Sequence, residues 1–270
     1  MNMDYHIKYI KYKKKYHELK KLYGGLNKLD FEDDDYEEDE DYDEDDDDER
    51  TIKIKQDLIE NSSDEDLVDL PLEFFKKLKT IYPATKHDEG RLDDDYKSYP
   101  ITYGEMEYKG INKLLKHLLE THKLDFKTFI DLGSGRGKLP FYVAGFKQIN
   151  KSIGIEIVKE RHDDAVEIKR QLNEHVEIVN KVILINDDFN KVNILEYTRD
   201  ISLVWISNLM FEQSLTDKLF RQLISKLPSN SIIVCSKEHA LDTDKLILLG
   251  KLVVPMSWKK NHIVYIYQII

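Results

Sequence analysis

The segment 129–137 reads F-I-D-L-G-S-G-R-G and carries the strongest structural signal in the chain. Its apolar start predicts a buried strand that ends in Asp131, and its three glycines predict a tight turn into a helix. Glycine adopts positive φ angles at little cost and lets the backbone approach a ligand closely. In doubly wound α/β folds, ligands bind beyond the carboxyl ends of the strands. We therefore expect a largely parallel sheet with a ligand at this turn.

Predicted strands and helices alternate along the rest of the chain. Strands are predicted at 128–131, 152–157, 182–185, 203–207 and 231–235, with helices near 138–147, 158–176 and 213–226. This alternation implies parallel strands, right-handed crossovers and helices on both faces. The β-rich runs 251–254 and 263–269 predict an antiparallel hairpin at the sheet edge, and helices at 67–82 and 106–120 precede the sheet. The predicted fold is a doubly wound, Rossmann-like α/β sheet preceded by a small helical section.

The spacing of the glycines narrows the choice of ligand. Dinucleotide-binding turns read G-x-G-x-x-G, whereas Gly133, Gly135 and Gly137 give G-x-G-x-G. The Gly-Lys-Ser/Thr ending of phosphate-binding loops is also missing. The tighter spacing, preceded by Asp131, resembles motif I of the class I methyltransferases. Their ligand, S-adenosylmethionine, carries an α-amino acid and a sulfonium, so a neighbouring acid suits it better than it would suit phosphate.

Two further acids follow successive predicted strands. Glu156 lies 23 positions after Gly133, where nucleotide-binding α/β folds place an acid that accepts the ribose hydroxyls. Asp188 and Phe189 follow the third strand, a position that contacts adenine in class I methyltransferases. Because parallel strands end at the same edge of a sheet, we expect Asp131, Glu156 and Asp188 to line one site.

A wider set of motifs resembles one family. In chain order they are Y-G-E at 103–105, D-L-G-S-G-R-G at 131–137, G-I-E at 154–156, D-F at 188–189, V-W-I-S-N-L-M-F at 204–211, I-I-V-C-S-K at 232–237 and S-W at 257–258, followed by Tyr265. This set resembles the disruptor-of-telomeric-silencing (Dot-one) histone-lysine methyltransferases, which lack a SET domain. The resemblance spans roughly residues 100–268.

The resemblance implies methyl transfer to a lysine of the histone core, presented by a nucleosome. S-adenosylmethionine, released as S-adenosylhomocysteine, would be held by Tyr103, Glu105, Met106, Asp131, Gly133, Gly135, Gly137, Lys138, Glu156, Asp188, Phe189 and Ser207. The catalytic residues would be Ser207, Asn208, Phe211 and Tyr265. Phe211 and Tyr265 would line a narrow channel for the substrate lysine.

Two positions depart from the family pattern. The family motif N-N-F-x-F reads S-N-L-M-F at 207–211, so Ser207 replaces the asparagine beside the methyl group. Met106 stands where the family's cofactor loop commonly has threonine. Both changes bear on substrate geometry rather than on methyl-donor binding.

The predicted chemistry is an in-line displacement in which a neutral amine attacks the methyl group of a sulfonium. Free lysine has a pKa of about 10.4, so a channel that favours the neutral amine is required. Burial among aromatic side chains does this, and Phe211, Tyr265 and Trp258 are candidates. The other requirement of the reaction is alignment of the amine nitrogen with the methyl carbon at about 3–3.5 Å. We therefore expect no obligate general base, with Ser207 and Tyr265 orienting the amine.

Charge divides the chain into segments. Residues 32–49 contain 16 acidic residues and residues 1–31 carry a net +5, which together account for the whole net charge of −11. We predict a basic amphipathic helix at 1–25, an acidic disordered linker at 26–65, a helical lead-in at 66–100 and the methyltransferase domain at 101–270. The lysines of the first segment predict contact with DNA or another acidic surface. The acidic run is either a solvated linker or a binder of basic proteins such as histones.

The cellular location of the protein is predicted from its cysteine content, from its lack of targeting segments and from the composition of its N-terminal segment. The single cysteine, Cys235, indicates a reducing compartment, and no signal peptide or membrane-spanning stretch is present in the sequence. We therefore expect an intracellular protein without a membrane partner. The Lys/Tyr-rich start ending at Gly24-Gly25 resembles the opening segment of many giant-DNA-virus proteins. That likeness implies a viral source and a place in the host nucleus, the viral factory or the virion.

Two other functions stay open at this point. The chain could be a class I methyltransferase that acts on RNA or on another protein. It could also be a non-catalytic module that binds histones through its acidic segment. The N-P-P-Y motif of adenine-N6 enzymes is absent, because S-N-L-M stands at that position, 207–210.

Overall fold

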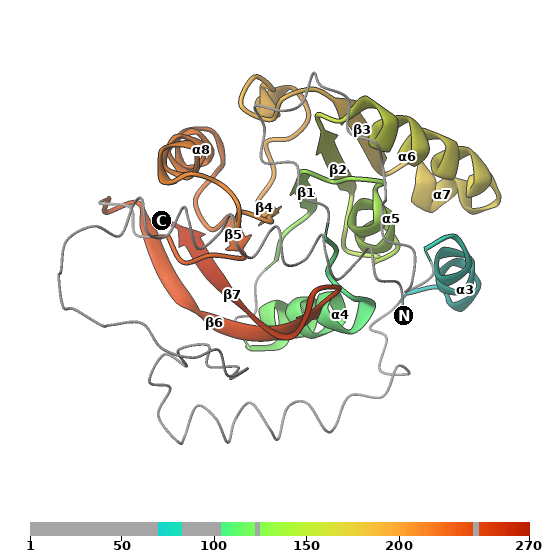
Figure 1. Cartoon of the computed structure of the whole chain (residues 1–270), viewed down its shortest axis with the longest axis horizontal. Helices are drawn as coiled ribbons and strands as arrows, with labels where there is room; N and C mark the ends of the chain where they lie inside the picture. The colour runs from blue at the N-terminus through green and yellow to red at the C-terminus, as the bar shows by residue number, and fades with distance from the viewer. Residues whose placement is uncertain (1–69, 83–103, 122–124, 240–242) are drawn as a thin grey trace, which may run out of the picture. The chain divides into compact units, whose positions relative to one another are not determined.

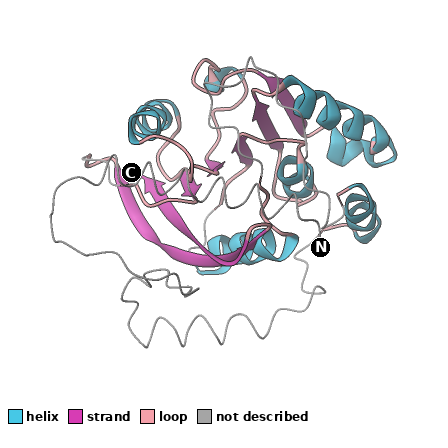
Figure 2. Ribbon diagram, viewed as in Figure 1, coloured by secondary structure: helices cyan, strands magenta, loops and turns pink. Residues whose placement is uncertain are grey.

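A seven-stranded sheet forms the centre of the described part of the chain, which in this computed structural model comprises residues 70–82, 104–121, 125–239 and 243–270 (Figures 1 and 2). The strands are β1 (Thr128–Leu132), β2 (Lys151–Glu156), β3 (Val182–Asn186), β4 (Ser202–Ile206), β5 (Ile232–Cys235), β6 (Leu246–Met256) and β7 (Lys259–Ile269). Their order across the sheet is β3-β2-β1-β4-β5-β7-β6. Strands β1 to β5 are parallel, and β7 runs antiparallel to both β5 and β6. The predicted mostly parallel sheet with a hairpin at its edge is therefore confirmed.

Helices cover both faces of this sheet. The helices are α3 (Leu72–Ile81), α4 (Tyr108–Lys116), α5 (Lys138–Ala144), α6 (Lys159–Gln171), α7 (Val176–Val179) and α8 (Gln213–Lys226). The first five contribute to one hydrophobic cluster, and α8 contributes to the cluster on the opposite face. This division follows from the strand order, because crossovers that run from β1 towards β3 and those that run from β4 towards β5 leave the sheet on opposite sides.

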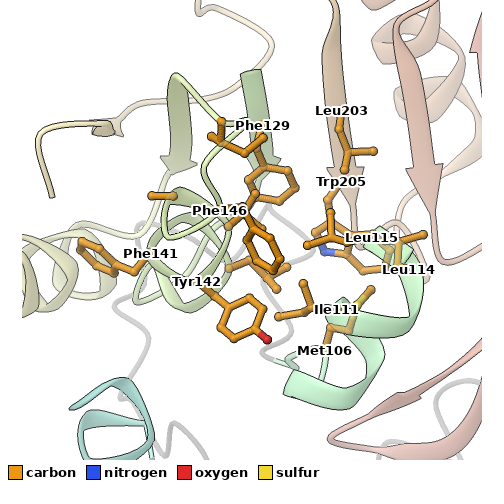
Figure 3. Close-up of a cluster of buried hydrophobic side chains, with 14 of the residues drawn as sticks. Met106, Ile111, Leu114, Leu115, Phe129, Phe141, Tyr142, Phe146, Leu203 and Trp205 are labelled. Carbon is orange, nitrogen blue, oxygen red and sulfur yellow. The ribbon is translucent and has the colours of Figure 1, made fainter. Parts of the chain in front are cut away.

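Strand β1 shows why the sheet is buried on both faces. All five of its residues are buried, and successive side chains point to opposite faces. Phe129 joins the cluster under α4 and α5, whereas Ile130 joins the cluster under α8. Figure 3 shows the first cluster, in which Phe129, Leu203 and Trp205 of the sheet face Leu115 of α4 and Phe146, just beyond α5.

The lead-in helix α3, predicted at 67–82, packs on α5 through one side. Phe74, Phe75 and Leu78 are buried, and Ile81 is half-buried. Beyond the helix, the Tyr82 hydroxyl donates a hydrogen bond of 2.6 Å to the carbonyl oxygen of Arg136, inside the glycine turn. The lead-in section is therefore hydrogen-bonded to the glycine turn at residues 133–137.

Several element boundaries differ from those predicted. Helix α4 begins at Tyr108 rather than at 106, because Met106 forms an antiparallel bridge with Met256 at the end of β6. The helix predicted at 158–176 ends at Gln171 and is followed by a short 3-10 turn and then α7. Strand β6 is much longer than the predicted run 251–254, because two irregularities, at 248–250 and 254–256, accommodate Gly250 and Pro255 within it.

The predictions for residues 1–69 and 83–103 fall outside the described residues. They include the basic helix, the acidic linker and Tyr103. Among the residues that the structure does describe, none of the helices is both long enough and apolar enough to span a bilayer.

Candidate active site

A cavity of about 350 Å³ opens at the carboxyl ends of β1, β2 and β4. Its lining combines the glycine turn, the strand ends and the segment before α4. The lining residues are Gly104, Glu105, Met106, Asp131, Leu132, Gly133, Ser134, Gly135, Lys138, Leu139, Glu156, Ile157, Arg161, Asp188, Phe189, Asn190, Trp205, Ser207, Phe211 and Leu215. Its size falls within the range of about 300–1,000 Å³ that is usual for small-molecule sites.

The glycine turn forms the floor of the cavity. Gly133, Gly135 and Gly137 have φ angles of 89°, 53° and 82°, a region that residues with a Cβ rarely adopt. The amides of Gly133 and Ser134 donate to the Ile155 carbonyl at 2.9 and 3.0 Å, which ties the turn to β2. A Cβ added at Gly133 would meet nothing within 4 Å, so the turn leaves open space there for a ligand.

Glu156 braces the turn from the end of β2. Its carboxylate accepts the Gly135 amide at 2.7 Å and the Val158 amide at 2.8 Å. The side chain is buried, and burial raises its pKa although these backbone bonds and the charge of Arg161 act in the opposite direction. Glu156 therefore lies directly beside the turn, as the order of the strand ends predicted.

Asp131 is the most deeply buried acid of the cavity wall. Burial raises its pKa well above the usual value, and the negative charges of Glu156 and Glu105 raise it further. Among the described lining residues, four carboxylates (Glu105, Asp131, Glu156 and Asp188) face two cations (Lys138 and Arg161). The cavity therefore has an excess of negative groups and favours a ligand that brings positive charge.

The segment before α4 closes one side of the cavity. Gly104 lies against the indole of Trp258, where an added Cβ would come within 2.3 Å of the ring. The Glu105 amide donates to Ser257 Oγ at 3.0 Å, and the Ser257 amide donates to the Glu105 carbonyl at 2.8 Å. The hairpin end thus fixes the Glu105 backbone, and its carboxylate pairs with Lys138 Nζ at 2.9 Å.

The opposite side of the cavity is built after β3 and β4. Asp188 Oδ1 accepts the amide and the side-chain amide of Asn190 at 2.9 and 3.0 Å. The ring of Phe189 stacks on that of Phe211, with centroids 5.8 Å apart and an interplanar angle of 24°. Leu215 also lines the cavity, whereas Trp205 lines it from the face of the sheet that packs under α4. The lining therefore includes apolar and aromatic side chains as well as acids.

Most of the predicted site residues come together in this cavity. Those that line it are Glu105, Met106, Asp131, Gly133, Gly135, Lys138, Glu156, Asp188, Phe189, Ser207 and Phe211. Gly137, Asn208 and Tyr265 do not line it, and neither does Trp258, the further candidate for the lysine channel. Tyr103, the remaining predicted residue, lies outside the described residues.

Gly137, Asn208 and Tyr265 pack against, hydrogen-bond to or pair with other parts of the protein instead. Gly137 precedes α5, where an added Cβ would come within 3.0 Å of the Phe141 ring. Asn208 is buried and uses its side-chain amide to hold the Lys237 backbone, accepting the Lys237 amide at 2.9 Å. Tyr265 lies on β7, paired with Cys235 of β5, with Lys251 Nζ 5.1 Å from its ring centroid.

Sequence reasoning missed several lining residues. They are Gly104, Leu132, Ser134, Leu139, Ile157, Arg161, Asn190, Trp205 and Leu215. Gly104, Leu132, Ser134 and Trp205 lie inside the quoted motifs but were given no role, and Leu139, Ile157 and Asn190 lie within two residues of a motif's end. Arg161 and Leu215 belong to helices that lean over the strand ends, and no sequence pattern indicated their contribution.

The arrangement of the sheet defines the class of protein. Five parallel strands followed by an antiparallel β7 inserted between β5 and β6 form the class I methyltransferase fold. An S-adenosylmethionine-dependent methyltransferase from Clostridium acetobutylicum is similar, with 13% identity and a TM-score of 0.45 over 60% of this chain and 91% of that chain. An RNA methyltransferase from Salinibacter ruber, in complex with S-adenosyl-L-homocysteine, has 20% identity and a TM-score of 0.41 over 58% of this chain and 90% of that one.

Sequence comparison then gives the family. The model of the family described as histone methylation protein DOT1 matches residues 83–247, and the chain belongs to this family. A histone-lysine N-methyltransferase of Drosophila melanogaster, specific for lysine 79 of histone H3, is 35% identical over 79 residues. That match covers 29% of this chain and only 4% of the Drosophila protein.

Proposed function

We propose that this protein is an S-adenosylmethionine-dependent histone-lysine N-methyltransferase. The observation that carries the proposal is the cavity at the ends of β1, β2 and β4, where the acids Asp131 and Glu156 adjoin a turn of three positive-φ glycines. Membership of the DOT1 family supports a histone as the substrate.

The residues of the cavity suit the methyl donor in size and in charge. The open space above Gly133 and the excess of carboxylates match a ligand with a sulfonium and an ammonium group. A pyrophosphate would meet Asp131 and Glu156 unfavourably for the same reason. All four residues line the cavity, and we assign Glu156 to the ribose hydroxyls, Asp188 and Phe189 to adenine, and Glu105 to the amino-acid end. When bound, the donor supplies an activated methyl group.

The apolar part of the cavity suits the acceptor. Phe211, which stacks on Phe189, and Leu215 line the cavity with apolar surface that disfavours an ammonium, so they would shift a lysine side chain towards its neutral, nucleophilic form. Ser207 follows β4 directly and lines the cavity, and we assign its hydroxyl to orient the amine. The chain would thus act by binding, orienting and excluding water.

The position of the target lysine on the histone is part of the same proposal. We propose that the target is a lysine of the histone core, presented by a nucleosome. The similarity to the Drosophila enzyme specific for histone H3 lysine 79 supports this choice over a histone tail.

The test uses a labelled methyl donor with nucleosomes, free core histones and RNA as separate substrates. We expect label in a core histone, strongest with nucleosomes, and mass spectrometry should locate it on a lysine. The variant Asp131→Asn should lose the label, whereas the exposed control Asp125→Asn should keep it. Labelling of RNA alone, or histone binding without any transfer, would contradict the proposal and support one of the two other functions.

A further inference from the structure

We propose that Gln213 and His239 are positioning residues for methyl transfer, because together they hold the end of the segment 207–213 on the acceptor side of the cavity. Ser207 and Phe211 of this segment line the cavity. The inference rests on the proposed function and deepens it, since it names residues outside the cavity lining that control how the acceptor is placed.

The segment 207–213 is attached at both ends to the residues that follow β5. At its start, Asn208 Oδ1 accepts the Lys237 amide at 2.9 Å. At its end, the side-chain nitrogen of Gln213 lies 3.1 Å from Nδ1 of His239. The same short stretch after β5 thus fixes the beginning and the end of the segment.

The middle of the segment is exposed. Leu209 and Met210 are 38% and 48% exposed, and Phe211, which follows them, is half-buried and stacks on Phe189. Loss of the attachment at Gln213 should therefore let this part of the segment move relative to the rest of the cavity.

His239 is a firm support because β7 and α8 hold it. Its amide donates to the Tyr267 hydroxyl at 2.8 Å, and its ring centroid lies 4.3 Å from that of Phe220. The imidazole is 1% exposed, and its Nε2 faces Asp217 Oδ1 at 3.4 Å.

The hydrogen bonds of Gln213 determine which form of the imidazole the contact needs. The amide nitrogen donates to Asp217 Oδ1 at 2.8 Å and also faces Nδ1 of His239. An amide nitrogen only donates, so Nδ1 must accept, and the neutral ring carries its proton on Nε2. A protonated ring would place an N–H against the amide nitrogen. Turning the amide round would instead place its oxygen against the Asp217 carboxylate.

The surroundings of the ring favour this neutral form. The titratable and charged groups around His239 belong to α8 (Asp217 and Arg221), to its own segment (Lys237 and Glu238), to β5 (Cys235) and to β7 (Tyr267). Burial lowers the pKa of His239, an effect that the Asp217 carboxylate opposes and the two cations increase. Burial also raises the pKa values of the thiol and the phenol to about 12, so neither changes its charge near neutral pH. The contact with Gln213 is therefore lost as the pH falls through the lowered pKa of His239.

The first test removes the donor at Gln213, which lies on the surface, and measures methyl transfer to nucleosomes by the full chain. Gln213→Met should lower kcat by about 3–10-fold, as expected for loss of one hydrogen bond. Calorimetry should show that its affinity for S-adenosylhomocysteine changes by less than about 2-fold, since the acids assigned to the donor lie on other elements. Ser214→Ala, the exposed neighbour on α8, should leave both quantities unchanged.

The second test uses pH. His239→Asn keeps an oxygen acceptor near the place of Nδ1 but cannot be protonated. Its rate relative to that of the unmodified chain should rise by about 3–10-fold between about pH 8 and pH 5.5, because only the unmodified chain loses the contact. The ratio cancels the titration of the acceptor amine, which both proteins share.

Two results would overturn the positioning role while leaving the proposed function in place. One is a Gln213→Met variant that is as active as the unmodified chain, or that loses affinity for S-adenosylhomocysteine as much as it loses rate. The other is a ratio for His239→Asn that stays constant with pH. An unmodified chain that methylates none of the substrates is a different result, because it would remove the proposed function together with this inference.

Discussion

At the scale of single residues, Asp131 shows how a binding site can lower the stability of the fold that carries it. Its pKa is raised by burial and by the neighbouring acids, so the folded protein holds the proton of this carboxyl more tightly than the unfolded chain does. Stability is therefore lost as the pH rises from about 3.9, the unfolded pKa, through the folded pKa. A cationic ligand would offset this cost.

We expect Asp131→Asn to be more stable than the unmodified chain at pH 8 and no more stable at pH 4. A gain of about 1 kcal/mol is typical for neutralising a strained site and corresponds to a Tm higher by about 2–4 °C. The same variant should bind S-adenosylhomocysteine at least about 100-fold more weakly. Thermal melts at both pH values and calorimetry check this, with Asp125→Asn as control. A lower Tm at pH 8 would contradict it.

Residue patterns predicted the polar part of the site better than its walls. Asp131 and Glu156 lie at the carboxyl ends of β1 and β2, Asp188 lies just after β3, and parallel strands bring such positions together. The environment of Asn208 could not be predicted, because its partner Lys237 lies 29 residues further along the chain, beyond the end of β5. The identity of a residue in a sequence motif does not determine the orientation of its side chain.

At the scale of elements, helix α3 is the part of the lead-in section with a defined packing partner. Phe74 is fully buried, and its ring meets the edge of the His175 ring with centroids 5.2 Å apart. It also lies close to Gly145 at the end of α5, where an added Cβ would come within 3.2 Å of the Phe74 ring. The helix is therefore attached to the same layer that carries the glycine turn.

We expect Phe74→Ala to lower the free energy of unfolding by about 3–5 kcal/mol, because it leaves a cavity in a packed core. Leu72→Ala, on the exposed side of the same helix, should change it by less than about 1 kcal/mol. Urea denaturation of the two variants measures the difference. Equal, small effects would mean that α3 contributes little to the core.

The sequence predicted whether each element is a helix or a strand better than it predicted the length of that element. Helix α8 was predicted at 213–226 and is observed at Gln213–Lys226. Strand β6 was predicted at less than half its length, because Gly250 and Pro255 are typical of turns. In this case Gly250 pairs with Ile266 of β7, and Pro255 lies at an irregularity between two paired positions, so the pairing with β7 continues the strand past both. This is a tertiary effect that local sequence does not contain.

At the scale of the whole molecule, charge is distributed unevenly between the methyltransferase fold and the rest of the chain. The segments 1–31 and 32–49 together account for the entire net charge, which leaves 50–270 without any. We propose that the basic start, 1–25, binds DNA or another acidic surface and that the acidic run is a linker. The fold itself was predictable from alternation and the glycine turn, whereas the predicted basic helix at 1–25 and the predicted acidic linker lie outside the described residues and stay predictions.

Deleting residues 1–25 should weaken nucleosome binding at low salt and leave S-adenosylhomocysteine affinity unchanged. This segment holds seven lysines against Asp4 and Glu18, and contacts between lysines and phosphates weaken steeply as salt rises. Affinities of the full and shortened chains should therefore converge between about 50 and 200 mM salt. Binding titrations across that range test this, and equal affinity at the lowest salt would contradict it.

The hydrogen bonds between Glu105 and Ser257 have a consequence for how the protein is made. They join residues 152 positions apart, so one wall of the cavity is complete only after Ser257 has been synthesised. While the ribosome is still translating the chain, a partial sheet can form, since domains begin folding during synthesis. A nascent chain that stops short of Ser257 therefore lacks this wall of the cavity.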